Sequence, residues 1–242
     1  VLNFFNSSAN ATTSLFMIVF FNYRGISSDK IGIVQSISPF LGFFVAPIAA
    51  AAADVSKRHT VVWVISIALS SAAVVSTIWA SSQHIVVLCC CIAIHSVFAS
   101  SGRPFLDRTV LMIAGTKYGR QRLFGSLGWG VTALAMGFIT NKFGPYSFFI
   151  GHVILSLLVI ATVITFRSLV QSPQQPQQGE VQPVVRIPFS ASIKMLLFQR
   201  RTFVLLARLF ITGVCQSQIS FLFLMLKDLW SVEKQLVGIY GL

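Results

Sequence analysis

The sequence predicts an all-α membrane protein, and its composition and apolar run lengths are the observations that predict it. Hydrophobic residues make up 55% of the 242 residues and charged residues only 10%, with a mean hydropathy of +0.80. Because a soluble domain usually carries roughly 25% charged residues, lipid is the expected solvent for so much apolar surface. Apolar runs near the length of about 20 residues that a spanning helix needs recur along the chain.

Six spanning helices are predicted before residue 168, separated by short polar loops. Their approximate ranges are 3–23, 31–53, 61–80, 85–114, 121–140 and 145–166. The first loop offers Ser27 or Ser28 as a cap for the second helix, with Asp29 in its first turn. The segments 54–60 and 115–120 are expected to be charged loops.

The first helix has a short apolar part, so it crosses a bilayer only if it includes polar residues. Asn3, Asn6, Asn10 and Thr13 recur at helical spacing and fall on one face. A polar stripe on a spanning helix faces a cavity or a neighbouring helix. We expect Asn3, Asn6 and Asn10 to line a cavity.

The composition changes after residue 167, which divides the chain into three predicted regions. Residues 1–167 form a six-helix transmembrane bundle. Residues 168–201 begin as a Pro/Gln-rich linker and end in a basic amphipathic segment. Residues 202–242 begin a second bundle, in which Gln216 and Gln218 are candidates to line a cavity or to bond a neighbouring helix. We expect the sequence to be a fragment of a longer protein.

The basic residues argue for membrane topology and against nucleic-acid binding. The formal net charge is +12, but the basic residues lie between apolar runs and not in one patch. They are densest in the loop after the second helix, the loop after the fourth and the linker region. Because the loops richest in Lys and Arg face the cytoplasm, the N-terminus is predicted to be cytoplasmic.

Asp107 is the main candidate for function on the fourth helix, since the chain has only 6 acidic residues. Ser96, Ser100, Arg103 and Asp107 fall on one stripe, and the last two are spaced for an ion pair. Asp107 lies about 33 Å along the helix from Ile85, close to the hydrocarbon thickness. Two interpretations are therefore open, an interfacial carboxylate and a group that lines a cavity.

Arg122, Ser126 and Trp129 form a second stripe, on the fifth helix. An arginine can hold a polar ligand with forked hydrogen bonds, and an indole can stack on a sugar or base. The alternative is that Arg122 is a topological anchor and Trp129 a packing residue. Small residues in the segment 125–130 permit close helix contact.

The segment 118–129, YGRQRLFGSLGW, resembles the fifth helix of the major facilitator superfamily, in its lactose permease-like and macrophage MHC receptor 2-like branches. The pattern Gly-x-Pro-x-x-acid at 102–107 resembles the fourth helix of the permease-like branch. Segment 47–58 is similar to the superfamily motif after the second helix. Pro47, Asp54 and Arg58 fit that motif, and Ala50, Val55 and Lys57 depart from it.

The resemblance implies a major facilitator fold, with a complete N-terminal six-helix bundle plus the start of the C-terminal bundle. It also implies roles for four residues. Asp107 and Arg122 would contact solute hydroxyls, Trp129 would stack on the solute, and Ser126 would lie beside it. The permease-like branch has acids in its seventh helix and this chain has none there. The resemblance also implies coupling to protons, although the family carries its proton-coupling residues mainly in later helices.

The sequence therefore predicts a secondary transporter for a small polar solute, sugar-like or nucleoside-like, embedded in the lipid bilayer and coupled to protons. The alternative is a membrane receptor or scaffold that keeps the fold without transport. No nucleophile–base pair is visible, so no enzyme is predicted. Cys89, Cys90 and Cys91 are interpreted as apolar residues, and neither a metal nor a cofactor is predicted. His95 and His152 are interpreted as packing residues.

Overall fold

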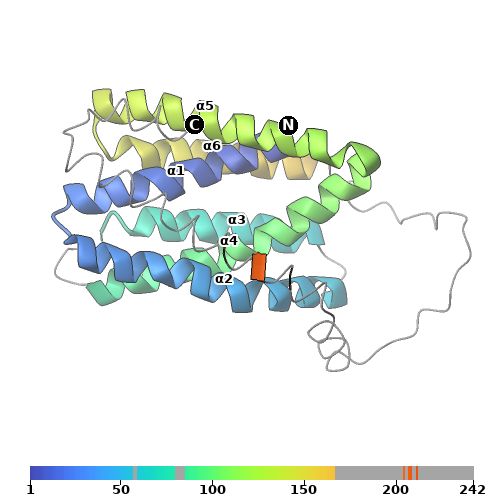
Figure 1. The fold of residues 1–242 in the computed structure, drawn as a ribbon, viewed down its shortest axis with the longest axis horizontal. Coiled ribbons are helices and arrows are strands. Elements are labelled where there is room, and N and C mark those ends of the chain that lie inside the picture. The colour runs from blue at the N-terminus through green and yellow to red at the C-terminus, as the bar shows by residue number, and fades with distance from the viewer. Residues whose placement is uncertain (57–58, 80–84, 167–203, 205–206, 209–210, 212–242) are drawn as a thin grey trace, which may run out of the picture.

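A computed structural model describes residues 1–56, 59–79 and 85–166, together with residues 204, 207, 208 and 211 (Figure 1). The predicted linker at 168–201 and the predicted cavity residues Gln216 and Gln218 lie outside the described residues. So do the basic residues Lys57 and Arg58. The described part of the chain is therefore mainly the region predicted to form the first bundle.

The described residues form six α-helices and one 3₁₀ turn, and contain no strand. The helices are α1 (Leu2–Tyr23), α2 (Ser28–Ser56), α3 (His59–Ser76), α4 (Ile85–Ala114), α5 (Tyr118–Phe143) and α6 (Ser147–Thr165), with η1 (Gly115–Lys117) before α5. The bounds of α4 match the prediction. The predicted basic loop at 115–120 is wrong in its second half, because a 3₁₀ turn leads directly into α5 three residues early.

Four of these helices are long and apolar enough to cross a membrane. They are α3, the first 27 residues of α4, α5 and α6. The protein is therefore a multi-pass membrane protein, as the composition predicted.

The helices pack in an exchanged arrangement. α1 contacts mainly α5 and α6, and α4 contacts mainly α2 and α3. The two sets of contacts correspond if α1 is exchanged with α4, α2 with α5 and α3 with α6. The α1–α5 contact then becomes the α4–α2 contact, and the α1–α6 contact becomes the α4–α3 contact. The contacts of the two halves are thus related by exchange of α1 and α4, a pattern typical of the internal repeats of membrane transporters. Figure 1 shows α1 beside α6, with α5 at one side of the bundle and α2 at the other.

α1 and α5 approach each other closely because α5 presents glycines to α1. A Cβ atom added at Gly128 would lie 2.5 Å from the carbonyl oxygen of Phe4, and one added at Gly125 would lie 2.9 Å from the hydroxyl of Ser7. The hydroxyl of Ser8 donates to the carbonyl of Gly128 at 3.0 Å, and the amide of Asn3 donates to the carbonyl of Gln121 at 3.2 Å. Small residues and interhelical hydrogen bonds together hold this helix pair, as is usual in membranes.

An aromatic cluster closes the opposite end of α1. Phe20 meets the rings of Phe148 and Phe149 edge-on, with centroids 5.9 and 4.9 Å apart. Just beyond, Arg24 donates to the hydroxyl of Tyr146 at 3.0 Å and to the carbonyl of Ile78 at 3.4 Å. These contacts tie α1 to α6 and to the end of α3.

Pro104 lies inside α4 and changes its course. A proline removes one helical hydrogen bond and crowds the preceding turn, which bends a helix. The last turns of α4 run obliquely across the bundle toward the start of α5 (Figure 1). The bend brings the end of α4 to α5. Residues before and after Pro104 therefore have different neighbours.

Replacing Gly128 with alanine should destabilise the bundle, although alanine is the better helix former. The added methyl meets the backbone of Phe4, which cannot move aside as a side chain can, so we expect a loss of about 1–3 kcal/mol. Thermal unfolding in detergent measures it. Gly119→Ala on the same helix is the control, because a Cβ there meets nothing within 4 Å. Equal melting temperatures for the two variants would contradict the close contact.

Candidate functional site

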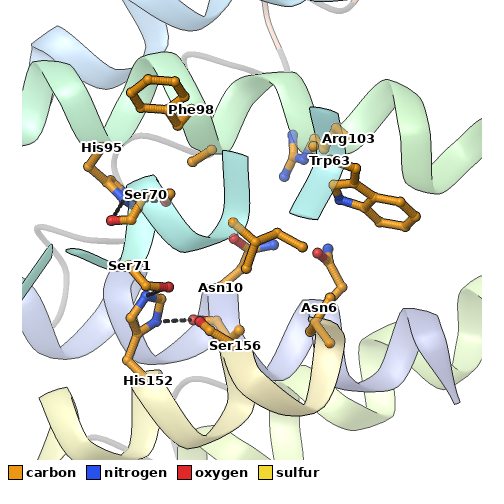
Figure 2. Close-up of a pocket in the computed structure, with 15 residues that line it drawn as sticks. Asn6, Asn10, Trp63, Ser70, Ser71, His95, Phe98, Arg103, His152 and Ser156 are labelled. Atoms are coloured by element: carbon orange, nitrogen blue, oxygen red, sulfur yellow. Dashed lines mark hydrogen bonds between the residues drawn. The ribbon is translucent and has the colours of Figure 1, made fainter. Parts of the chain in front are cut away.

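Two polar regions stand out in the described bundle, and the first is a partly open cavity of about 70 Å³ between α1, α3, α4 and α6 (Figure 2). Its polar lining consists of small hydroxyls, two amides, two imidazoles, one indole and one guanidinium. They belong to Asn6, Asn10, Trp63, Ser70, Ser71, His95, Arg103, His152 and Ser156. None of the described Asp or Glu residues lines this cavity.

The two histidines close one end of the cavity and are hydrogen-bonded within the bundle. Nδ1 of His152 lies 3.0 Å from the hydroxyl of Thr12 and 3.2 Å from the carbonyl of Ala9, and Nε2 lies 3.4 Å from the hydroxyl of Ser71. Nδ1 of His95 lies 2.9 Å from the hydroxyl of Ser70. His152 is 5% exposed. Both rings pack between helices, in agreement with their interpretation as packing residues.

The other end of the cavity is formed by Arg103, Trp63 and the amides of Asn6 and Asn10 (Figure 2). Trp63 is 1% exposed, and its indole N–H has no hydrogen-bond partner among the described residues. Gly102 lies directly against it, since a Cβ there would be 3.4 Å from the indole nitrogen. Arg103 is exposed at the cavity edge. Asn6 and Asn10 line this cavity as a polar stripe on α1 suggested, whereas Asn3 contacts α5 instead.

The second polar region runs along α5 and includes Asp107. The carboxylate of Asp107 is exposed and accepts a hydrogen bond of 2.9 Å from the hydroxyl of Tyr118. Tyr118 precedes Arg122 by one helical turn, and Ser126 follows one turn later, so the three share a face of α5. Arg122 and Ser126 are exposed. We call Asp107, Tyr118, Arg122, Ser126 and Trp129 the α5 stripe.

Trp129 ends the α5 stripe and is only half-buried. Part of its indole packs against the core cluster around α1, which is the packing role considered for it, and the rest stays accessible. Three of the four predicted solute residues, Arg122, Ser126 and Trp129, thus lie on one face of α5. The fourth, Asp107 on α4, is joined to that face through Tyr118.

The predicted ion pair between Arg103 and Asp107 is absent from the described structure. Asp107 bonds Tyr118 at the start of α5, and Arg103 lies at the cavity. The bend at Pro104 separates the two side chains despite their four-residue spacing. The rest of the polar stripe on α4 packs against α2: the hydroxyl of Ser96 lies 2.6 Å from that of Ser38.

Sequence reasoning missed Tyr118 and Trp63. Tyr118 could have been found, because it precedes Arg122 by four residues and extends the predicted stripe by one turn. Trp63 gave no signal, since a tryptophan in an apolar run is typical of packing and only the fold brings its N–H to Gly102.

Comparison with known families matches residues 1–240 to the MFS_1 like family. A curated relative, an uncharacterized transporter named YwbF from Bacillus subtilis (strain 168), is 25% identical over 123 residues. The alignment covers 50% of this chain and 30% of YwbF, so the chain spans only part of the length of that relative. No solved structure matches the chain significantly. The matched family is one of transporters and not of enzymes.

Replacing His152 with phenylalanine should lower stability, because the hydroxyl of Thr12 and the carbonyl of Ala9 lose an interhelical partner. The Thr12 hydroxyl still donates to the Ala9 carbonyl at 2.7 Å, so the loss is that of the interhelical hydrogen bonds, about 0.5–1.5 kcal/mol each. Thermal unfolding in detergent measures the loss. Ser156→Ala, on the same helix one turn later, is the control and should change stability little. A melting temperature for His152→Phe equal to that of the wild type would refute the structural role.

Proposed function

This chain belongs to the MFS_1 like family of the major facilitator superfamily, and on that premise we propose that it is part of a secondary transporter for a small polar solute. In this proposal residues 1–167 form the first six-helix bundle, with α1 and α2 crossing the membrane like the other four helices. Residues 168–201 link it to a second bundle that begins at residue 202. The N-terminus is cytoplasmic, as the basic loops predict.

The α5 stripe carries the proposal. It places a carboxylate, a phenol, a guanidinium, a hydroxyl and an indole within one face of one helix and the end of another. Arg122 and Ser126 make no hydrogen bond or ion pair with any described residue, so their polar atoms are available. Unpaired charged groups on a spanning helix are costly unless a ligand or water meets them.

Each residue of the α5 stripe has a distinct task in this proposal. Arg122 donates paired hydrogen bonds to neighbouring solute oxygens, and Asp107 accepts from a solute hydroxyl. Trp129 offers the accessible part of its indole as an apolar stacking surface. The Tyr118 hydroxyl holds Asp107 toward the same face. Neighbouring hydroxyls above one apolar ring face are the features of sugars and nucleosides, which we propose as the solute class.

The exposure of the α5 stripe is consistent with a site shared between two bundles. In alternating access the two bundles rock about a site at their interface. The side of that site contributed by the first bundle would be uncovered in the first bundle alone. Coupling to protons is proposed from family membership and has no residue assigned to it in the described helices.

Replacing Arg122 with glutamine in the full-length protein should weaken solute binding about ten- to hundredfold. Hydrogen bonds to a charged group contribute about 1.5–3 kcal/mol, and a neutral amide loses most of that. Uptake into proteoliposomes from a panel of radiolabelled sugars and nucleosides first identifies the solute, and its concentration dependence gives the apparent affinity. Arg120→Gln on the same helix, two residues away on another face, is the charge-matched control and should transport normally.

The same assay separates transport from the receptor or scaffold alternative. A folded full-length protein that transports nothing in the panel, yet still binds one of the solutes, would favour a receptor. Normal uptake by the Arg122→Gln variant would remove the α5 stripe from the solute site.

Replacing Tyr118 with phenylalanine should lower the apparent affinity for the solute in uptake assays about fivefold while leaving folding intact. The hydroxyl is needed to position Asp107, and one hydrogen bond is worth about 1 kcal/mol. The apparent affinity for the solute measures the effect. An Asp107→Asn, Tyr118→Phe double variant should be no worse than Asp107→Asn alone, because both changes act through one carboxylate. Additive losses would show that Tyr118 acts on the solute independently.

A further inference from the structure

We propose that the cavity between α1, α3, α4 and α6 binds a small monovalent inorganic anion of the size of chloride or nitrate. The ligand would lie between the guanidinium of Arg103, the indole N–H of Trp63 and the amides of Asn6 and Asn10 (Figure 2). This site is separate from the α5 stripe and lies inside the first six helices.

The charge of the cavity lining favours an anion. Of the described residues that line the cavity, Arg103 is the single charged one, and none is a carboxylate. The nearest acid along α4, Asp107, is bonded to Tyr118. Within the described helices Arg103 has no hydrogen-bond or ion-pair partner. It also belongs to the part of α4 that is apolar enough to span the membrane. A guanidinium on a spanning helix is stabilised by a counter-charge, and a bound anion supplies one.

The indole of Trp63 gives a second and independent indication. Its N–H is buried, its ring is 1% exposed, and no described residue accepts a hydrogen bond from it. A buried donor without an acceptor costs about 1–3 kcal/mol, so such groups are nearly always satisfied by a neighbour, a water or a ligand. Gly102 packs beside the indole nitrogen, because a Cβ at residue 102 would lie 3.4 Å from it. The indole, the guanidinium and the amides of Asn6 and Asn10 lie around the same space in Figure 2.

The size of the cavity limits the ligand to a few atoms. Pockets for drug-sized molecules have volumes of about 300–1,000 Å³, whereas this cavity has about 70 Å³. A sugar or nucleoside does not fit within this volume, and no residue of the α5 stripe lines the cavity. Its donors come from a guanidinium, an indole and two amides, which are complementary to a compact anion.

Thermal unfolding of the full-length protein in detergent tests the proposal. The protein is kept in potassium gluconate, and gluconate is replaced stepwise by chloride, nitrate or sulfate at constant ionic strength. A ligand that binds only the folded state raises the unfolding midpoint. We expect saturable shifts with chloride and nitrate and none with the larger, divalent sulfate. Equilibrium binding of radiolabelled chloride to the same sample provides a second measurement.

Two variants locate the site. Arg103→Gln should weaken the apparent chloride affinity about ten- to hundredfold, because a charge-assisted contact is lost. Trp63→Phe keeps the charge and removes one neutral donor, so it should weaken the affinity about fivefold. Arg120→Gln, which also removes one positive charge but lies outside the cavity, should bind chloride as the wild type does.

Two outcomes would overturn the proposal. The first is a wild-type protein that shows neither a saturable shift nor chloride binding, which would mean that the cavity holds water only. The second is an Arg103→Gln variant, eluting as a single folded peak, with wild-type chloride affinity. If Arg103→Gln does not fold, unchanged affinity in Trp63→Phe overturns the site in its place. None of these results depends on solute transport.

Discussion

The close contact between α1 and the glycines of α5 is the constraint on which the rest of the bundle depends. α1 carries many polar side chains, and polar groups packed between the helices of a membrane bundle need partners on those helices. Gly125 and Gly128 let the two backbones approach, so that Ser8 and Asn3 donate directly to carbonyls of α5. This contact fixes the rotation of both helices. One side of α1 is closed against α5, and the side that carries Asn6 and Asn10 is left to line the cavity.

The same contact decides which face of α5 stays available. With its glycines against α1, α5 presents an adjacent face that carries Tyr118, Arg122 and Ser126. Trp129 lies between these two environments, which explains why it is half-buried and packs against the core around α1. An α5 rotated by one residue would turn Arg122 toward α1, which carries no acid to pair with it. The small residues and the charged residues of this helix therefore form one pattern, in which close packing on one face leaves the next face available for a ligand.

Sequence periodicity predicted the helices well, because apolar runs and loop residues are local signals. The bounds of α4 and the all-helical class follow from such signals. Periodicity was less informative about what a polar residue contacts, since a stripe looks the same whether it faces a neighbour or a cavity. Ser96 has its partner on α2, while Arg103, on the same predicted stripe, lies at the cavity. The choice depends on which helix is adjacent, and the exchange of α1 and α4 between the two repeats cannot be read from any single segment.

The bend at Pro104 explains how two charged residues four positions apart serve different surroundings. In a straight helix Arg103 and Asp107 would neutralise each other, as their spacing predicts. With the bend, Asp107 reaches Tyr118 at the start of α5 and Arg103 lies at the cavity beside Trp63. Each charge thereby loses the partner that the four-residue spacing offers. For Asp107 the phenol of Tyr118 is a neutral partner that leaves the carboxylate able to accept another hydrogen bond. For Arg103 the described helices provide no partner. The bend thus leaves each of the two charged side chains to find a partner outside α4.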